Sequence, residues 1–165
     1  MSTVTQYTLR RLTPADKPAV MALLVREWGA VEVAALSIGG VIDASELPGW
    51  LAESDDEVVG MLTYLVREEV AELVTINAFT GGGVGAALVA ALVEECRARG
   101  IRGIHVTTTN DNMRALRFYQ RAGFRLAALR VDVMTEVRKL KPEIPSHGFD
   151  GIPIRDEIEL TMELP

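Results

Sequence analysis

The chain has 165 residues, of which 48% are hydrophobic and 24% charged, and its formal net charge is -6 at pH 7. This length predicts one domain over residues 1–165, and the acidic balance argues against a nucleic-acid-binding protein. No apolar run reaches the roughly 20 residues that cross a bilayer, and the N-terminus has no signal-peptide core, so we expect a cytoplasmic protein without a membrane partner. The single cysteine, Cys96, agrees with a reducing compartment.

The first half of the chain predicts mostly strands. Thr13 is the expected N-cap of a helix that has Pro14 at its first position and ends at Gly29. A second helix is expected over residues 31–38. The expected strands are residues 7–12, 47–53, 57–67 and 70–79, with tight turns between the last three.

In the second half, helices alternate with strands. Apolar residues recur at helical spacing from Val84 to Cys96. A further helix follows, capped by Asn110 or Asn112. The expected strands are residues 104–109, 124–130 and 152–164. Only Asp156 interrupts the apolar face of the last strand.

Residues 80–85 read Thr-Gly-Gly-Gly-Val-Gly and connect a predicted strand to a predicted helix. The first N–H groups of a helix have no intrahelical acceptor, and the helix dipole is positive at that end. Glycines let a bulky anion approach these N–H groups closely. Three consecutive glycines exceed what a tight turn needs, which favours a phosphate-binding loop over a turn that binds nothing.

Two other phosphate-binding motifs fit this loop less well. A Walker loop needs Gly-Lys followed by Ser or Thr, and the residues after the glycines supply neither lysine nor hydroxyl. The spacing Gly81-x-Gly83-x-x-Ala86 formally matches the dinucleotide fingerprint, with Asp111 after the next strand. The loop lies mid-chain, however, and Asp111 follows at more than the expected ~20 residues. A nicotinamide-dependent oxidoreductase is therefore the less favoured alternative.

Two segments together point to a family. Residues 110–124 read NDNMRALRFYQRAGF and resemble the A-x-x-F-Y-x-x-x-G-F segment of the GNAT superfamily of acyl-CoA-dependent N-acetyltransferases. Residues 80–85 resemble its Arg/Gln-x-x-G-x-G/A loop, which carries the pyrophosphate of coenzyme A. The motifs occur in family order, and ELVTINAF and the tail LKPEIPSHGFDGIPIRDEIEL are similar to a subgroup of uncharacterised bacterial members. Thr80 stands where the family has Arg or Gln; because the loop binds through backbone N–H groups, we expect binding to survive.

The resemblance implies an α/β fold with a mixed, mostly antiparallel central sheet flanked by helices. It also implies acetyl-CoA as the cosubstrate, no metal, and acetyl transfer to a primary amine by direct attack. An ammonium ion cannot attack a thioester, so a base must remove a proton, and an acid can protonate the departing thiolate. The alternative on the same scaffold is a non-catalytic acyl-CoA-binding or regulatory module.

The resemblance also assigns residues. Tyr119 matches the family tyrosine and is the expected acid, with packing in the core as its alternative. Glu72 is the expected base, because several members place a glutamate early on this strand and apolar neighbours raise the pKa of a carboxyl group. A solvent-facing glutamate fits the strand pattern equally well. The expected cofactor-binding residues are Ile76, Asn77, Ala78, Gly81, Gly82, Gly83, Val84, Gly85, Ala86 and Asn112.

The sequence has no motif that identifies the acceptor, so the prediction of its chemistry rests on charge. The segments expected to face it carry Arg26, Arg155 and a larger acidic set: Glu32, Asp43, Glu46, Glu53, Asp156 and Glu157. This balance predicts a small cationic amine or polyamine-like acceptor over an acidic one, and a peptide acceptor also stays open. His105 and His147 are isolated and lack metal-ligand spacing. Core packing is favoured for Trp28 and Trp50, and the wall of a substrate pocket is their alternative. The sequence leaves open whether the chain forms a homodimer.

Overall fold

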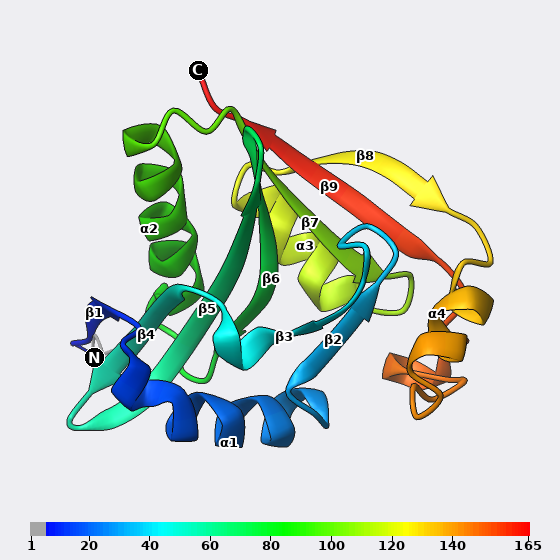
Figure 1. Ribbon diagram of the computed structural model, residues 1–165, viewed down its shortest axis with the longest axis horizontal. Helices are drawn as coiled ribbons and strands as arrows, with labels where there is room; N and C mark the ends of the chain where they lie inside the picture. The colour runs from blue at the N-terminus through cyan, green and yellow to red at the C-terminus, as the bar shows by residue number, and fades with distance from the viewer. Residues whose placement is uncertain (1–5) are drawn as a thin grey trace.

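The computed structural model describes residues 6–165. They form a seven-stranded sheet with helices on both faces, beside a separate two-stranded hairpin (Figure 1). The helices are α1 (Lys17–Trp28), α2 (Val84–Ala98), α3 (Met113–Arg121) and α4 (Met134–Leu140). The strands are β1 (Thr8–Arg11), β2 (Glu32–Ala35), β3 (Gly40–Asp43), β4 (Gly49–Ser54), β5 (Glu57–Arg67), β6 (Val70–Ala78), β7 (Gly103–Thr109), β8 (Arg125–Arg130) and β9 (Glu157–Glu163).

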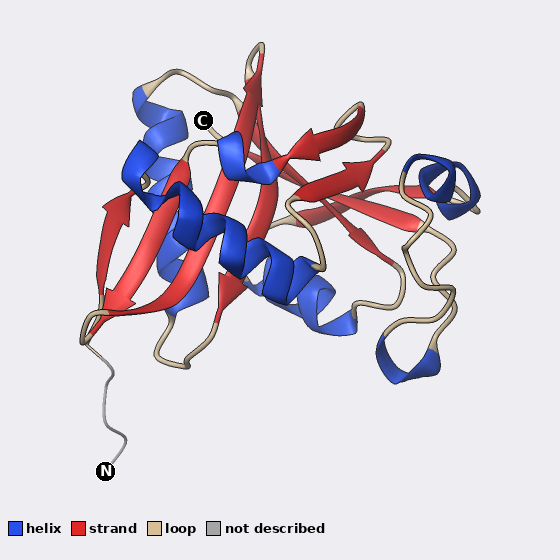
Figure 2. Ribbon diagram, turned by 60° about the horizontal axis from the view of Figure 1, so that its bottom comes forward, coloured by secondary structure: helices blue, strands red, loops and turns tan. Residues whose placement is uncertain are grey.

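The large sheet has the order β1-β4-β5-β6-β7-β9-β8. Only the central β6–β7 pair is parallel, and the other neighbouring pairs are antiparallel. This arrangement confirms the expected mixed, mostly antiparallel sheet. The helix α1 crosses one face, while α2 and α3 lie behind the other (Figure 2).

The residues that were expected to begin and end the first helix do so in the structure. Thr13 and Asp16 form the expected capping box, and a short 3₁₀ turn then leads into α1. Gly29 ends this helix with φ +80°, a left-handed conformation that glycine adopts without a Cβ clash. The turns at Asp55 and Glu68, which connect the central strands, also have positive φ.

The helix expected over residues 31–38 is wrong. This segment forms β2 and a turn that leads into β3, so the two strands make an antiparallel hairpin. Val31 and Val33 are β-branched and alternate with Glu32, which suits a strand. Gly39 and the residue after it have φ of +83° and +121°, so the chain reverses there instead of continuing a helix.

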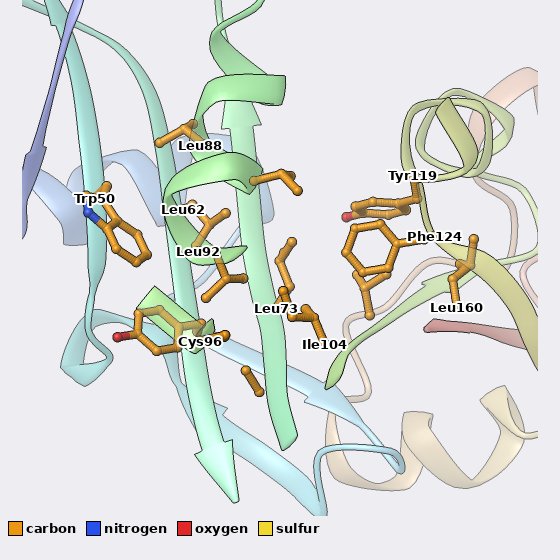
Figure 3. Packing of buried hydrophobic residues seen from close by; sticks show 14 of the residues in the cluster. Trp50, Leu62, Leu73, Leu88, Leu92, Cys96, Ile104, Tyr119, Phe124 and Leu160 are labelled. Atoms are coloured by element: carbon orange, nitrogen blue, oxygen red, sulfur yellow. The ribbon is translucent and has the colours of Figure 1, made fainter. Parts of the chain in front are cut away.

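Two apolar cores lie on opposite faces of the sheet. One packs α2 and α3 against the strands, and its α2 members recur along one stripe: Val84, Leu88, Val89, Leu92 and Cys96. Figure 3 shows several of these side chains together with Tyr119 and Phe124 from the α3 end. The other core packs Val20, Leu23 and Leu24 of α1 against Leu51 and Met61. Trp50 is 6% exposed and stacks on Tyr64, which confirms it as a core residue.

The C-terminal part differs from the expected single long strand. The strand β9 covers only Glu157–Glu163, and α4 was not foreseen. Asp132 has φ +57° and starts a turn before α4, which buries only Met134 and Val137. Seven residues with two buried positions give too weak a periodic signal to predict a helix.

Candidate active site

The two central strands pair for only part of their length. β6 and β7 are paired from Val70 to Leu73, opposite Gly103 to Val106. Beyond that point they diverge (Figure 1), and residues 75–78 have no strand partner on the β7 side in the described part of the chain. Their backbone N–H and C=O groups on that edge are therefore available to another molecule.

A β-bulge lies at the same place. Thr63 pairs with Thr75 and Tyr64 pairs with Leu73, which leaves Val74 as an extra residue in β6. Bulges bend a strand and change where its side chains point. The bulge therefore contributes to the divergence of β6 from β7, and no motif in the sequence indicated it.

The glycine loop leads from β6 into α2 with unusual backbone geometry. Gly82 and Gly83 have φ of +78° and +82°. In residues 6–165, Ala87 is the first residue of this turn whose N–H reaches a backbone acceptor, Gly83 O at 2.9 Å. A Cβ at Gly81 or Gly83 would have nothing within 4 Å, so the loop faces open space. These features fit the binding of a phosphate group at the helix N-terminus.

Gly85 has a different role from the other loop glycines. A Cβ at Gly85 would lie 3.0 Å from Phe118 Cε2, so this residue lets α3 approach α2 closely. The loop therefore serves two purposes, because its first glycines face open space and its last one permits helix packing.

Tyr119 lies on the α2 and α3 side of the sheet and is 6% exposed. Its ring makes edge-to-face contacts with Phe118 and Phe124, with centroids 5.4 and 5.6 Å apart. Figure 3 shows its hydroxyl pointing away from α3, toward the strand that carries Leu73. Burial raises the pKa of Tyr119, so its hydroxyl keeps its proton in the neutral range.

Glu72 lies on the opposite face, because its neighbours Ala71 and Leu73 point into the α2 core. It is only 8% exposed, and its Oε2 is buried without a hydrogen-bond partner. Burial, and next the charge of Glu159, raise the pKa of Glu72 from 4.5 to about 7. The alternative of an ordinary solvent-facing strand glutamate is therefore wrong.

His105, which the sequence suggested was isolated, is part of the same cluster. It pairs with Glu72 across β6 and β7, and its Nδ1 lies 3.7 Å from Glu72 Oε1 and 3.7 Å from Glu159 Oε1. Arg130 of β8 forms an ion pair with Glu159. The alternation of apolar and polar side chains in residues 103–109 could have predicted this position. Ile104 points into the core, so its neighbour His105 lies on the Glu72 face.

The remaining expected cofactor residues occupy the ends of β6 and α3. Asn112 accepts a hydrogen bond from Ala115 N at 3.0 Å, so it is the N-cap of α3 in place of Asn110. Asn77 Oδ1 accepts a hydrogen bond from Trp28 Nε1 at 2.8 Å. Trp28 is 39% exposed, so its assignment to the core is wrong, and it lies beside the unpaired end of β6.

Most acidic residues expected near the acceptor are engaged elsewhere. Glu53 is bound by Arg10, Glu46 by Lys17, and Asp43 accepts hydrogen bonds from Ser45. Asp156 accepts from the backbone N–H of residue 132, where it holds the loop after β8.

Two further residues have different environments. Glu157 is buried at 2% exposure. Asp111, the aspartate of the dinucleotide pattern, is also buried and accepts hydrogen bonds from Thr109 Oγ1 and Phe149 N. Those contacts tie β7 to the C-terminal loop.

Residues 13–124 match the model of the Acetyltransferase (GNAT) family. The chain is also 39% identical over 150 residues to the Uncharacterized protein YxbD of Bacillus subtilis (strain 168), which covers 90% of this chain and 93% of that protein. The chain therefore belongs to the GNAT family and is an N-acetyltransferase, as the two motifs indicated.

Solved structures agree on the fold. The IAA acetyltransferase from Bacillus cereus ATCC 14579 has a TM-score of 0.73 at 24% identity, over 96% of this chain and 100% of that chain. A GNAT family acetyltransferase from Elizabethkingia anophelis, solved with acetyl-CoA bound, has a TM-score of 0.67 at 20% identity, over 96% and 98% of the two chains. Among residues 6–165, no helix is both long and apolar enough to cross a membrane.

Proposed function

We propose that the chain transfers the acetyl group of acetyl-CoA to a primary amine by direct attack, with Glu72 as the base and Tyr119 as the acid. The observation that carries this proposal is their placement. Both are buried on opposite faces of the sheet; Glu72 precedes the last β6–β7 pair by one residue, and the Tyr119 hydroxyl points toward the strand that carries Leu73 (Figure 3). An acceptor amine and a thioester that meet where β6 and β7 diverge would each have one proton-handling group on its own side.

The glycine loop and β6 fit the cosubstrate, which supplies the acetyl group as a thioester. The N–H groups of the first α2 turn lack backbone acceptors, and the space in front of Gly81 and Gly83 is open. A pyrophosphate fits there because it is an anion with several acceptor oxygens. The unpaired edge of residues 76–78 offers backbone groups to the pantetheine amides, and Asn112 can contribute its free donor group. The acetyl-CoA bound to the Elizabethkingia anophelis protein of the same fold supports this assignment.

Glu72 suits the role of base because its pKa of about 7 lies near neutral pH. A base with a pKa near the working pH is often deprotonated and still binds a proton strongly. It would accept the proton that the ammonium group loses before attack, directly or through water. His105 is 32% exposed at its side chain and lies beside Glu72, so it offers a route for that proton toward solvent.

Tyr119 suits the role of acid because burial keeps its hydroxyl protonated. When the amine attacks, the sulfur of coenzyme A leaves as a thiolate, and the phenol can donate a proton to it. Its two edge-to-face contacts hold the ring in one orientation. The same contacts fit the packing alternative, so turnover of Tyr119→Phe is the measurement that separates the two roles.

The deciding experiment measures thiol release from acetyl-CoA across a broad panel of primary amines. We expect at least one amine to accelerate release, and Tyr119→Phe to lower kcat roughly tenfold or more while acetyl-CoA binding is retained. Tyr7→Phe, at a half-buried tyrosine in the same core, is the matched control and keeps full turnover. Unchanged turnover in Tyr119→Phe removes the proposed acid.

A thermal-shift comparison addresses the two alternative functions. A ligand present at a hundred times its Kd stabilises the folded protein by about 2.7 kcal/mol. We expect acetyl-CoA to raise the Tm and NAD to leave it unchanged. Stabilisation by acetyl-CoA without thiol release for any amine supports the non-catalytic module, and stabilisation by NAD alone supports the oxidoreductase.

A further inference from the structure

In residues 6–165, five buried side-chain atoms have no hydrogen-bond partner. They are Ser37 Oγ, Glu72 Oε2, Thr107 Oγ1, Arg130 Nη1 and Glu157 Oε2. Buried polar atoms in folded proteins are nearly always paired, so such exceptions point to a missing water, ion or ligand. Four of these residues lie on the sheet face opposite α2 and α3, and Ser37 lies in the turn of the β2–β3 hairpin.

Strand register places four of these residues on that face. Glu72 is opposite His105, Thr107 is opposite Glu159, and Glu157 is opposite both Thr109 and Arg130. Alternate residues of a strand share a face, so His105 and Thr107 point the same way, as do Glu157 and Glu159. We call Glu72, His105, Glu159, Arg130 and Glu157 the polar row.

The turn of the β2–β3 hairpin lies over the far end of the polar row. The backbone amide of Leu36 approaches Glu157 and lowers its pKa, opposing the effect of burial. Two residues later, Ile38 O accepts a hydrogen bond from Arg67 of β5. Ser37, with its unpartnered hydroxyl, lies between these two contacts. Figure 1 shows the hairpin in front of the region where β6 and β7 diverge.

The charges of the polar row determine which ligand it fits. It contains three carboxylates against one guanidinium, that of Arg130, which pairs with Glu159 and leaves its Nη1 unpartnered; Arg67 beside the row donates to Ile38 O and keeps its positive charge. The row is therefore negative when His105 is neutral. Glu157 is 2% exposed, and its free Oε2 needs a hydrogen-bond donor. An ammonium group supplies both N–H donors and positive charge.

We propose that the polar row binds a second ammonium group of the acceptor, so that the acceptor is a diamine or a longer polyamine. One amine reacts beside Glu72, and another stays charged and donates a hydrogen bond to Glu157. This inference rests on the proposed amine acetylation and identifies the substrate class of that site. Of the acids in the sequence-based prediction it keeps only Glu157, and it adds Glu72 and Glu159.

The test compares α,ω-diaminoalkanes with monoamines of matching chain length in the thiol-release assay. We expect kcat/KM to be higher for the diamines and to reach a maximum at one chain length. Glu157→Gln should raise KM for the best diamine roughly tenfold, which corresponds to about 1.4 kcal/mol, and raise KM for the matching monoamine clearly less. Glu163→Gln, at an exposed glutamate of the same strand, is the matched control and should change neither.

A direct binding measurement keeps the proposal falsifiable if the variant does not fold or if no amine is turned over. In the presence of coenzyme A, the diamine should raise the Tm of the unmodified protein more than the matching monoamine does. Equal shifts, or equal effects of Glu157→Gln on both substrate types, overturn the second-ammonium subsite. If monoamines are acetylated as well as diamines, the proposed function stands and only this inference fails. If no amine releases thiol but the diamine shift is present, the inference stands and the catalytic proposal fails.

Discussion

The two faces of the sheet meet where β6 and β7 diverge, and they are built in opposite ways. On one face, a glycine loop, the start of α2 and the aromatic residues of α3 come from two nearly continuous segments of the chain. On the other face, the polar row takes one or two side chains from each of four strands, with a hairpin from the N-terminal part above it. Around this point the first face is apolar with backbone donors and the second is polar and negative, while elsewhere on the second face α1 covers an apolar core.

This difference teaches what each face can recognise. Backbone N–H groups at a helix start bind phosphate groups with little dependence on side-chain identity. The site on the α2 face therefore suits a cosubstrate shared by many enzymes. Side chains drawn from separate strands can change independently, so the other face suits an acceptor particular to this chain. The predictions below test this division, from the largest expected effect to the smallest.

Glu72→Gln should have the largest effect, because it removes the proposed base without changing the volume of the side chain. We expect kcat to fall about 10²-fold or more and the acidic limb of the pH–rate profile, near the pKa of about 7, to disappear. Binding of acetyl-CoA, measured by calorimetry, should not change. Glu57→Gln, at an exposed glutamate of the neighbouring strand β5, is the control. A variant that keeps both the rate and the acidic limb removes Glu72 from the mechanism.

Gly83→Val tests the cosubstrate face. Gly83 has φ +82°, where a β-branched residue is strained, and it lies at the N-terminus of α2. We expect the Kd for acetyl-CoA to rise at least tenfold, or about 1.4 kcal/mol. Gly100→Val imposes a similar strain at φ +68° after the other end of α2, so it should lose stability and keep its affinity. Equal affinity losses in the two variants mean that strain alone explains the effect.

The cosubstrate face could be predicted because its signals are local. The glycine loop, the apolar stripe of α2 and the segment around Tyr119 each lie within a few turns of chain, and their order carried the family resemblance. The Asn112 cap and the positions of most strands followed from the same short-range patterns.

The other face could not be predicted because it depends on register. A shift by one residue moves a strand side chain to the opposite face, so the burial of Glu72 and the approach of His105 required the actual strand pairing. The helix expected over residues 31–38, where β2 and the hairpin turn lie, was wrong for a related reason. Short apolar segments fit either periodicity, and only the glycine-containing turn and its contacts select the strand form.

Gly85→Val tests whether the last loop glycine serves helix packing. A Cβ at this position would already lie 3.0 Å from the Phe118 ring, and valine adds two further carbon atoms. We expect chemical denaturation to show a loss of about 1–3 kcal/mol in the free energy of unfolding. Ala90→Val, at an exposed position of the same helix, should change it little. Adding Phe118→Leu should restore part of the loss, and strictly additive effects would contradict direct contact.

The pH dependence of stability tests the burial of Glu72. Its pKa rises from 4.5 to about 7 on folding, so the folded protein binds this proton more tightly than the unfolded chain does. The resulting stabilisation is complete below the unfolded value and is lost as the pH rises through 7. Glu72→Gln should therefore gain stability relative to the unmodified protein across this window, by at most about 1.4 kcal/mol per pH unit. Parallel stability curves for the two proteins would contradict the raised pKa.

Substitution of Trp28 should have the smallest effect on acetyl-CoA binding, and it tests the junction between the two faces. Its indole N–H donates to Asn77 at the unpaired end of β6, and the side chain is 39% exposed, whereas Trp50 is buried at 6%. Acetyl-CoA bound along residues 76–78 should alter the surroundings of Trp28 and change the intrinsic fluorescence of the protein. Trp28→Phe should abolish that change and weaken binding about twofold, and Trp50→Phe should preserve the change. A fluorescence change that survives Trp28→Phe would place the cosubstrate away from the end of β6, because no other tryptophan lies beside that strand edge.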